Sequence, residues 1–369
     1  MITGRGDASV FVDRALLEAQ VLAGAGAPED ACAALDAVVH LDRARVMPEL
    51  HKLLDGMAVE ERGIAFRFVP GGTFAMGDDL REPDERPQHE VTLPGFWLSE
   101  APLSWDDVMQ VLGFPPAPER ATREQIDALG DDVVRALAAD WGFRGGDRIR
   151  LQYCENQTLH ARDWHAHEQG STWQQGDKIV TSQEIFGSPE RHDKSSPYRY
   201  DQKPMIAVSF HVAEIVANRL STTGRARYRV PSEAEWERAA RGCWRGADYP
   251  WGDDEPDGAR ADFGHFKDFA IQPSRSHAPN DYGLFAMAGG VWEWCADHYD
   301  AGYYARSPKV SPLCVLSDDD VPARDRRRVV RGGSWADDAD VLRCSFRAAL
   351  SDDDGSSPNV GIRVARDTR

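Results

Sequence analysis

The sequence RGGSW (Arg331–Trp335), with GIR (Gly361–Arg363) behind it, frames the C-terminal part of this chain. Each motif places an arginine at one edge of the intervening segment. We expect both arginines to be fixed by charge-assisted hydrogen bonds to carboxylates or carbonyls of the core. The residues between the two motifs then decide what the segment can do.

Five further motifs precede this frame along the chain. They are VPGGTFAMG (69–77), DERPQHEV (84–91), PMIAVSF (204–210), RVPSEAEWE (229–237) and YGLFAMAGGVWEW (282–294). In this order the blocks resemble the core of the formylglycine-generating (sulfatase-modifying factor) family. The resemblance implies an α+β fold with a C-type-lectin-like sheet and little regular secondary structure. Eleven Trp residues suit such a loop-rich fold, because large flat side chains can pin irregular backbone.

Catalytic members of that family look like copper-dependent oxidases with two cysteines, two and seven positions after the aromatic residue that ends Gly-Gly-Ser. Counted from Trp335, these positions hold Asp337 and Leu342. Neither side chain can supply the thiolates that Cu(I) selects or a redox thiol. Cys344 is the only thiol of the segment. We therefore expect no copper and none of the family's oxidase chemistry.

Composition and charge restrict the partners and the location of the protein. The 369 residues carry a formal net charge of −18. An acidic surface of this kind repels phosphate backbones and anionic lipid headgroups, so we expect no nucleic-acid and no membrane partner. No stretch approaches the roughly 20 apolar residues of a membrane span, and the N-terminus lacks the pattern of a signal peptide. We expect a cytoplasmic protein with scattered, reduced cysteines.

The chain divides into a helical N-terminal part and a main domain. Apolar spacing predicts helices from about Ser9 to Glu61, with a break at residues 24–28. Residues 1–62 are thus a small bundle, which serves either as a packing extension or as an adaptor for a partner protein. Residues 63–369 form the family-like domain, with helices over 207–222 and from residue 231. A divergent insertion at about 114–203 interrupts it and opens with a helical portion at 122–140.

Two groups of residues have metal-ligand chemistry. His160, His165, His167 and Glu168 crowd together in the insertion, but without the His-x3-His-x-Glu spacing by which related sulfoxide synthases hold iron. A solvated polar loop is the favoured interpretation of this group.

The family resemblance also implies structural calcium, held by carboxylates and backbone carbonyls. Carried over by position, one site would use Asp262, the carbonyl of Phe263, and Asp268. The other would use Glu293 with the carbonyls of Gly289 and Val291. Ala286 and Gly290 depart from the family pattern at this second site. Ordinary loop hydrogen bonding is an equally good interpretation of both groups.

Acidic residues elsewhere have structural interpretations. Glu233, Glu235 and Glu237 belong to a helix start that nearly every family member has. The runs 318–320 and 352–354 are typical of solvated turns.

The composition of the last segment suggests a more specific hypothesis. From Ala336 to Arg369 there is no Lys, Glu, Gln, Met or Trp. Randomising the adenines of an Asn codon that ends in a pyrimidine cannot produce these five residues, and a set of lectin-fold variable proteins diversified by retroelements varies in this way. Their frame is also similar, with Leu342-Arg343 and Arg347 between the two motifs. The alternative is an acidic, high-GC chain that drifted into this composition.

These observations favour a non-catalytic protein that binds a ligand, most simply another protein, on a scaffold of this family. When a rigid frame holds the functional loops, the loop side chains can choose the ligand while the frame maintains the fold. The expected scaffold side chains are Arg331, Trp335, Arg343, Arg347 and Arg363. The expected ligand-binding positions are Ala336, Asp337, Asp338, Asp340, Val341, Ser345, Phe346, Ala348 and Leu350. A metal-dependent oxidase or sulfoxide synthase, and a regulatory pseudoenzyme subunit, stay open as alternatives.

Overall fold

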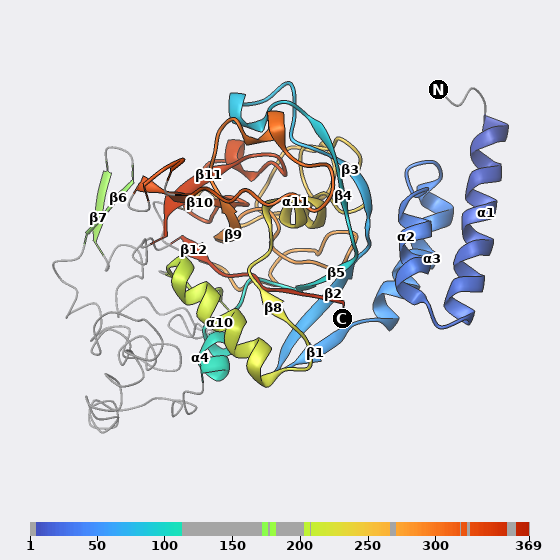
Figure 1. Cartoon of the computed structure of the whole chain (residues 1–369), viewed down its shortest axis with the longest axis horizontal. Coiled ribbons are helices and arrows are strands. Elements are labelled where there is room, and N and C mark those ends of the chain that lie inside the picture. Colours follow the sequence, from blue (N-terminus) through green and yellow to red (C-terminus); the bar gives the residue numbers. More distant parts are fainter. Residues whose placement is uncertain are drawn as a thin grey trace.

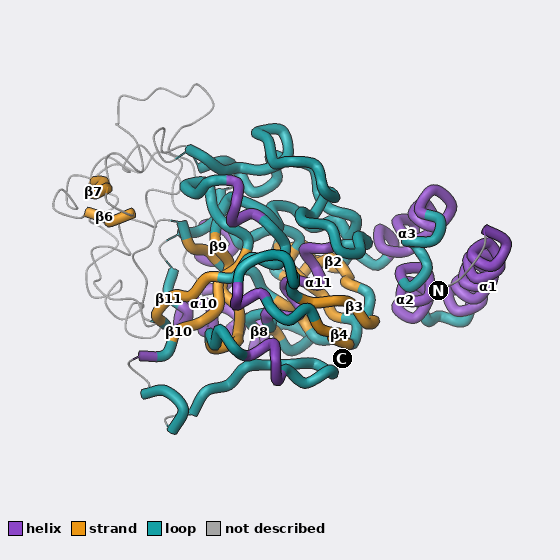
Figure 2. The backbone as a smooth tube through the Cα atoms, turned by 90° about the horizontal axis from the view of Figure 1, so that it is seen from above, coloured by secondary structure: helices purple, strands orange, loops and turns teal. Residues whose placement is uncertain are grey.

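The computed structural model describes residues 5–112, 172–175, 178–181, 203–206, 208–265, 271–317, 319–322, 325–352 and 359–368. The N-terminal helices stand at one side of the molecule, with α1 outermost (Figure 1). A view from above shows the same arrangement (Figure 2). Strands and long loops form the main body, which confirms the mixed α+β class expected from the sequence.

The N-terminal bundle contains the three helices α1 (Arg5–Gly24), α2 (Pro28–Asp36) and α3 (Arg43–Gly56). Proline in the first turn of α2 has no N–H to leave unpaired, and two acids follow it at the positive end of the helix dipole. The side chain of Asp42 caps α3 by accepting from the Arg45 N–H at 3.2 Å. The predicted break at 24–28 is therefore confirmed.

The prediction that the helices extend to Glu61 is wrong, because α3 ends at Gly56 and a strand follows. Strand β1 (Val59–Glu61) pairs antiparallel with β2 (Ile64–Val69). The two residues that connect them, Arg62 and Gly63, have φ values of 53° and 76°. Positive φ at both turn positions is what a two-residue hairpin requires. The main sheet thus begins a few residues before the boundary that helical spacing suggested.

The main domain contains two sheets of four or more strands among the described residues. The first has the order β1-β2-β5-β13-β8, where β5 is Phe96–Ser99, β8 is Tyr228–Arg229 and β13 is Ala365–Arg366. The second has the order β11-β10-β9-β12, with β9 (Trp292–His298), β10 (Arg327–Arg331), β11 (Ala348–Ser351) and β12 (Val360–Gly361). The chain returns near its end to both sheets, because β12 pairs with β9 and β13 lies between β5 and β8.

Shorter elements complete the domain. Two separate hairpins are β3 (Gly72–Met76) with β4 (His89–Leu93), and β6 (Thr172–Gln175) with β7 (Lys178–Thr181). The α-helices are α4 (Trp105–Leu112), α10 (Phe210–Thr223) and α11 (Glu233–Arg241). Single 3-10 turns are η1 (Pro83–Glu85), η2 (Tyr303–Arg306) and η4 (Ala339–Leu342). The two predicted helices near 207–222 and 231 are thus present as α10 and α11.

Side-chain caps explain where α10 and α11 begin. Ser209 accepts from the Val212 N–H at 3.4 Å. Ser232 and Glu235 form a reciprocal capping box, with bonds of 3.2 and 2.8 Å. Every residue of α11 is buried, although five of the nine are charged. This helix is therefore placed to bind other charged groups inside the protein.

The bundle and the main domain share one hydrophobic core. Asp36, at the end of α2, accepts from the Tyr282 hydroxyl at 2.6 Å and also binds the Arg238 guanidinium. Arg43 pairs with Asp281 at 2.5 Å and lies 4.0 Å from the centroid of the Trp244 ring. These contacts dock the bundle onto the domain. Among the described helices, none is long and apolar enough to cross a membrane.

Candidate functional site

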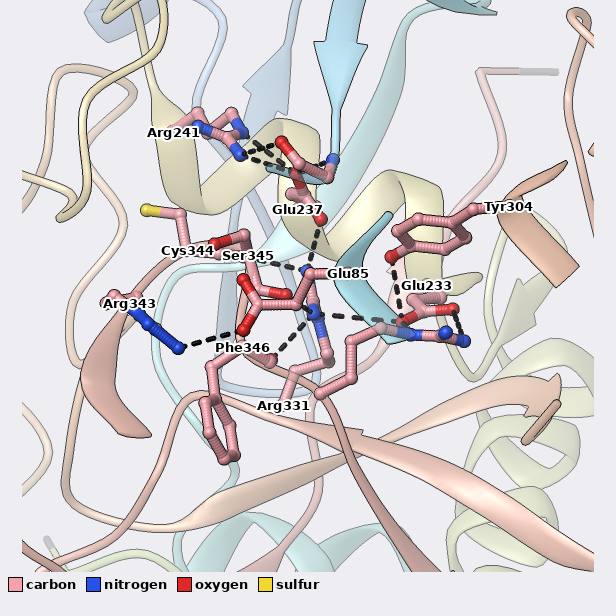
Figure 3. Close-up of polar contacts among 12 residues, drawn as sticks. Glu85, Glu233, Glu237, Arg241, Tyr304, Arg331, Arg343, Cys344, Ser345 and Phe346 are labelled. Carbon is pink, nitrogen blue, oxygen red and sulfur yellow. Dashed lines mark hydrogen bonds and ion pairs between the residues drawn. The ribbon is translucent and has the colours of Figure 1, made fainter. Parts of the chain in front are cut away.

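The C-terminal segment starts at the last residue of β10, Arg331, which is fully buried. Its Nη1 donates to the carbonyls of Ser345 at 2.7 Å and Phe346 at 2.6 Å. Its Nη2 donates to the Cys344 carbonyl at 2.7 Å and to the Glu237 carboxylate (Figure 3). One guanidinium thus binds three successive carbonyls of the returning chain and fixes its path.

Glu237 supplies the negative charge under this arrangement. It lies on α11, is fully buried, and accepts from the Gly77 N–H at 2.9 Å and from Arg241 Nη2 at 2.7 Å. Burial by itself raises the pKa of Glu237, but the guanidinium groups of Arg241 and Arg331 outweigh it, so the pKa lies below its usual range. The carboxylate is therefore ionised and compensates the buried arginines.

Two more arginines of the segment bind carboxylates from distant parts of the chain, and Figure 3 labels Arg343 and its partner Glu85. Arg347 donates through Nε and Nη2 to both oxygens of Glu233, at 2.6 and 2.9 Å, and lies 4.3 Å from the Tyr304 ring centroid. Arg343 donates to Glu85 Oε1 at 2.8 Å. Bidentate geometry and the aromatic face restrict how the Arg347 guanidinium can turn. The middle of the segment is consequently held at two further points.

The far end of the frame is held by Arg363. This residue is fully buried and donates to Glu293 Oε2 at 2.8 Å, to the Ser99 carbonyl at 2.7 Å and to the Phe285 carbonyl at 2.7 Å. Trp335, the aromatic residue that ends the first motif, is also buried. All five expected scaffold side chains therefore lie inside the protein.

The expected ligand-binding residues differ in exposure: some are exposed, some are partly exposed and some are buried. Asp338 and Asp340 are exposed on either side of the start of η4. The partly exposed members are Val341, Phe346, Ala348 and Leu350. The Phe346 ring lies 6.1 Å from the Trp292 ring and 5.4 Å from the Arg343 guanidinium, measured to ring centroids. These partly exposed side chains lie on the backbone that the arginines anchor.

Ser345 and Ala336 were expected to be ligand-binding positions, but the structure buries both side chains. The carbonyl of Ser345 is held by Arg331, which draws that part of the chain against α11. Ala336 directly follows the buried Trp335, and its N–H donates to Ser334 Oγ at 3.3 Å. Neither side chain is available to choose a ligand in this conformation.

Asp337 also points inward, against expectation. Its carboxylate accepts from the Trp292 indole N–H at 2.8 Å and from the Ser334 hydroxyl. Its backbone carbonyl accepts from the Gly264 N–H. Burial raises the pKa of Asp337, although both hydrogen bonds oppose this effect. The first of the two cysteine positions is thus occupied by an acid that holds the loop to β9.

The second cysteine position is part of a small apolar cluster. Leu342 is fully buried and packs with Tyr249, Ala261 and Ala288. Cys344, two residues further, is buried as well, and burial raises the pKa of its thiol to about 12. A thiol of this kind is neither a good nucleophile nor a ready metal ligand.

The remaining cysteines of the described chain have the same character. Cys32, Cys243, Cys295 and Cys314 are all buried and unpaired by disulfides. Burial raises the pKa of Cys32 and Cys314 to about 12 and that of the other two well above the usual value. Within the described residues, the protein therefore offers no reactive thiol.

The residues expected to bind calcium are partly engaged already. Asp262 Oδ2 accepts from the Gln272 N–H at 2.9 Å, and the Asp262 carbonyl accepts from the Gly290 N–H at 2.8 Å. Glu293 Oε2 accepts from Trp236 and Arg363 at 2.7 and 2.8 Å. The buried atoms Asp262 Oδ1 and Glu293 Oε1 accept no hydrogen bond from any described residue, and His265 Nε2 lies 3.4 Å from Asp262 Oδ1. Oxygens of this kind suit a hard cation, and calcium stays a prediction.

The positions of the other residues expected to bind calcium say less about whether a metal binds. Phe263 is half-buried against the Leu342 cluster, and Val291 is fully buried. Gly289 forms a parallel bridge with Asp262. Among the residues that the structure describes, there is no group of three or more His, Cys, Asp or Glu side chains arranged for a metal. Asp268, the helical portion at 122–140, and the cluster of His160, His165, His167 and Glu168 lie outside the described residues.

Comparison with known proteins gives the family. Residues 57–368 match the sulfatase-modifying factor enzyme 1-like domain. The chain belongs to this family. Its three N-terminal helices precede the matched residues, so they are an addition to the family domain.

Curated relatives of this sulfatase-modifying factor-like chain include both active and inactive proteins by name. A formylglycine-generating enzyme of Streptomyces coelicolor is 31% identical over 324 residues, covering 81% of this chain and 88% of the relative. The inactive C-alpha-formylglycine-generating enzyme 2 of Bos taurus is 28% identical over 325 residues, covering 80% and 86%. The solved structure of PvdO from Pseudomonas aeruginosa has a TM-score of 0.53 at 21% identity, covering 85% and 98%, which shows a shared fold.

The sequence predicted that the arginines at the two edges of the segment bind carboxylates or carbonyls of the core. It did not show which carboxylates these are. Glu85 lies in the second motif, and Glu233 and Glu237 lie in the fourth. A helix start accounts for only part of the role of Glu233 and Glu237, because each also binds an arginine of the C-terminal frame. One feature of the sequence could have pointed to these partners. The second and fourth motifs contain several acidic residues, although their other residues are typical of a buried core.

Proposed function

We propose that this chain is a non-catalytic member of the family that binds another protein through the surface between Trp335 and Val360. The observation that carries the proposal is the state of the two cysteine positions. Asp337 is hydrogen-bonded inward and Leu342 is packed in an apolar cluster, so neither can provide a thiolate. The backbone between and beyond them is nevertheless held rigidly by four buried arginines.

The exposed residues of this segment suit a protein ligand. Phe346 and Val341 offer partly exposed apolar surface, and Asp338 and Asp340 of the same segment are exposed acids. An apolar centre with a polar rim is the usual composition of a protein interface. Aromatic anchors of this kind carry much of the binding energy. We therefore expect a partner that presents a cationic patch next to an apolar residue.

The family context supports a function without oxidase chemistry. One relative over most of its length is itself named an inactive formylglycine-generating enzyme. A rigid frame with a changeable surface would also suit a segment diversified by a retroelement, as the composition after Trp335 suggests. Comparing this segment among chains from closely related genomes would test that variation directly.

The experiment joins an activity assay to a binding assay. Purified protein is incubated with a cysteine-containing sulfatase peptide and copper, with the Streptomyces coelicolor relative as the positive control. Mass spectrometry should show no conversion to formylglycine by this chain. Conversion would contradict the proposal.

The binding assay uses a partner isolated from the native host by cross-linking and then purified. The double variant Asp338→Lys/Asp340→Lys should weaken its affinity by roughly tenfold or more, because like charges then face each other. The control Glu60→Lys/Glu255→Lys makes the same change of charge at two exposed acids of other elements. Equal affinity for both double variants would place recognition elsewhere on the chain.

A further inference from the structure

Helix α1 has two apolar faces, and only one of them is covered. Val12, Ala15 and Ala19 are buried against the rest of the bundle. Val10, Leu17 and Val21 are 65%, 64% and 63% exposed. At 100° per residue, these three positions fall within about 40° of one another, so they form one stripe along the helix.

The stripe is unusual for this molecule. Among the described residues, eight large hydrophobic side chains are exposed, and four of them, these three and Phe11, lie on α1. Singly exposed apolar residues need no explanation, whereas an aligned set marks an interaction surface. The helix lies at the outer edge of the molecule in both views (Figures 1 and 2). It also lies outside the residues that match the family.

We propose that this stripe is the contact by which two copies of the chain form an antiparallel dimer through α1. The spacing of the stripe is close to self-complementary. When two α1 helices run antiparallel about a two-fold axis near residue 15, Val10 of one copy faces Val21 of the other, and the two Leu17 side chains lie near the axis. A two-fold contact of this kind uses the same surface on both copies.

Charge complementarity favours the antiparallel direction. Arg14 and Glu18 flank the stripe on the same side. A two-fold axis brings this side of one copy against the same side of the other, so each Arg14 meets the Glu18 of the second copy. Asp13, on the opposite flank, is already paired with Arg45 at 2.5 Å. In a parallel dimer Arg14 would face that engaged Asp13, while Glu18 would gain nothing.

The docked bundle holds the stripe ready for such a contact. The Asp13–Arg45 pair ties α1 to α3, and Asp36 ties α2 to the main domain. Little conformational entropy is then lost when a second copy binds. The helix is about 30 Å long for its 20 residues, which gives a small interface, so the dimer should be concentration-dependent. It would carry two C-terminal surfaces and bind a repetitive partner with avidity.

Sedimentation velocity of the full chain over a range of micromolar concentrations tests the proposal. The wild-type protein should pass from monomer to dimer as concentration rises. Leu17→Gln/Val21→Gln should weaken dimerisation by roughly tenfold or more, because the apolar stripe is then polar. The control Val310→Gln/Val315→Gln changes two other exposed valines, 66% and 67% exposed, and should leave the dimer unchanged. All variants are checked for an unchanged far-UV spectrum and melting temperature.

Charge-swap variants test the antiparallel pairing itself. Arg14→Glu alone and Glu18→Arg alone should each weaken the dimer, since like charges then meet twice. An equimolar mixture of the two variants should dimerise again, and so should the double variant Arg14→Glu/Glu18→Arg. A protein that stays monomeric at every concentration would overturn the proposal. So would a dimer that ignores the stripe variants, or a monomer whose α1 stripe instead binds neutral lipid vesicles.

Discussion

Arg331, Arg347 and Arg363 are buried beneath the C-terminal segment, whereas Asp338 and Asp340 of the same segment are exposed to water. The buried arginines each meet a carboxylate and one or more carbonyls, so their charges are compensated. The exposed acids have no such role in holding the backbone. Charged side chains of one short segment thus do two jobs: the buried ones set its shape, and the exposed ones remain available for a partner.

The largest expected effect is at the frame. Arg331→Ala should lower the free energy of unfolding by roughly 3–5 kcal/mol, because three carbonyls and Oε2 of the fully buried Glu237 lose their donor, while Arg241 and Gly77 still bind Oε1. Urea denaturation followed by fluorescence measures the change. The control Arg327→Ala removes an exposed arginine from the same strand, β10, and should change stability by less than about 0.5 kcal/mol.

A second variant keeps this test informative if Arg331→Ala does not fold. In Arg331→Met/Glu237→Gln the charged pair is removed, and the amide oxygen introduced at position 237 can still accept from Arg241, so the loss should be smaller than the sum of the two single losses. Equal stability of Arg331→Ala and Arg327→Ala would show that the buried network contributes nothing and that the contrast with the exposed stretch is only one of position.

A smaller effect concerns a buried acid of the same region. Asp297 accepts from the backbone N–H groups of Glu233 and Cys314 at 2.7 and 2.8 Å. Burial raises the pKa of Asp297 from 3.8 to about 7, and the nearby Glu233 charge adds to this effect. Since the folded state then binds a proton that the unfolded state has released, stability is lost as pH rises between these two values.

Asp297→Asn should remove that pH dependence. The free energy of unfolding of the wild-type protein should fall relative to that of the variant between pH 4 and pH 7, by roughly 2 kcal/mol when the raised pKa is converted at 1.36 kcal/mol per unit and discounted for relaxation. Chemical denaturation at several pH values measures the difference. Parallel curves for the two proteins would mean that Asp297 titrates normally.

The smallest effect is expected at the exposed stretch. Asp338→Lys/Asp340→Lys should shift the free energy of unfolding by less than about 0.5 kcal/mol, because both side chains are exposed. Differential scanning calorimetry compares its melting temperature with that of the wild type. Unfolding of this variant would show that the two acids belong to the frame, and the division between frame and surface would have to be redrawn.

Asp337 shows how far sequence reasoning reached. Counting from Trp335 was enough to find an acid and a leucine in place of two cysteines, because that step needs only identity and spacing. The direction in which Asp337 points depends on the backbone at Gly332 and Gly333, whose φ values are 100° and 69°. Glycine allows either sign of φ, so its presence does not fix the turn. The expectation that Ser345 faces solvent was therefore wrong, and the partly exposed Asp337 directs its carboxylate inward.

The order of the motifs, the helix caps and breaks, and the amino acids at the two cysteine positions were determined by the sequence alone. The motifs and the two positions are read directly from the sequence. The helix caps and breaks depend on residues only a few positions apart, whose local propensity and hydrogen bonding determine where a helix begins and ends. The pairs Arg343–Glu85, Arg347–Glu233 and Arg331–Glu237 join residues that are 258, 114 and 94 positions apart. Only the tertiary structure decided them, because many acids could compensate a buried arginine, and the packing of α11 and η1 against the C-terminal segment selects the partner of each.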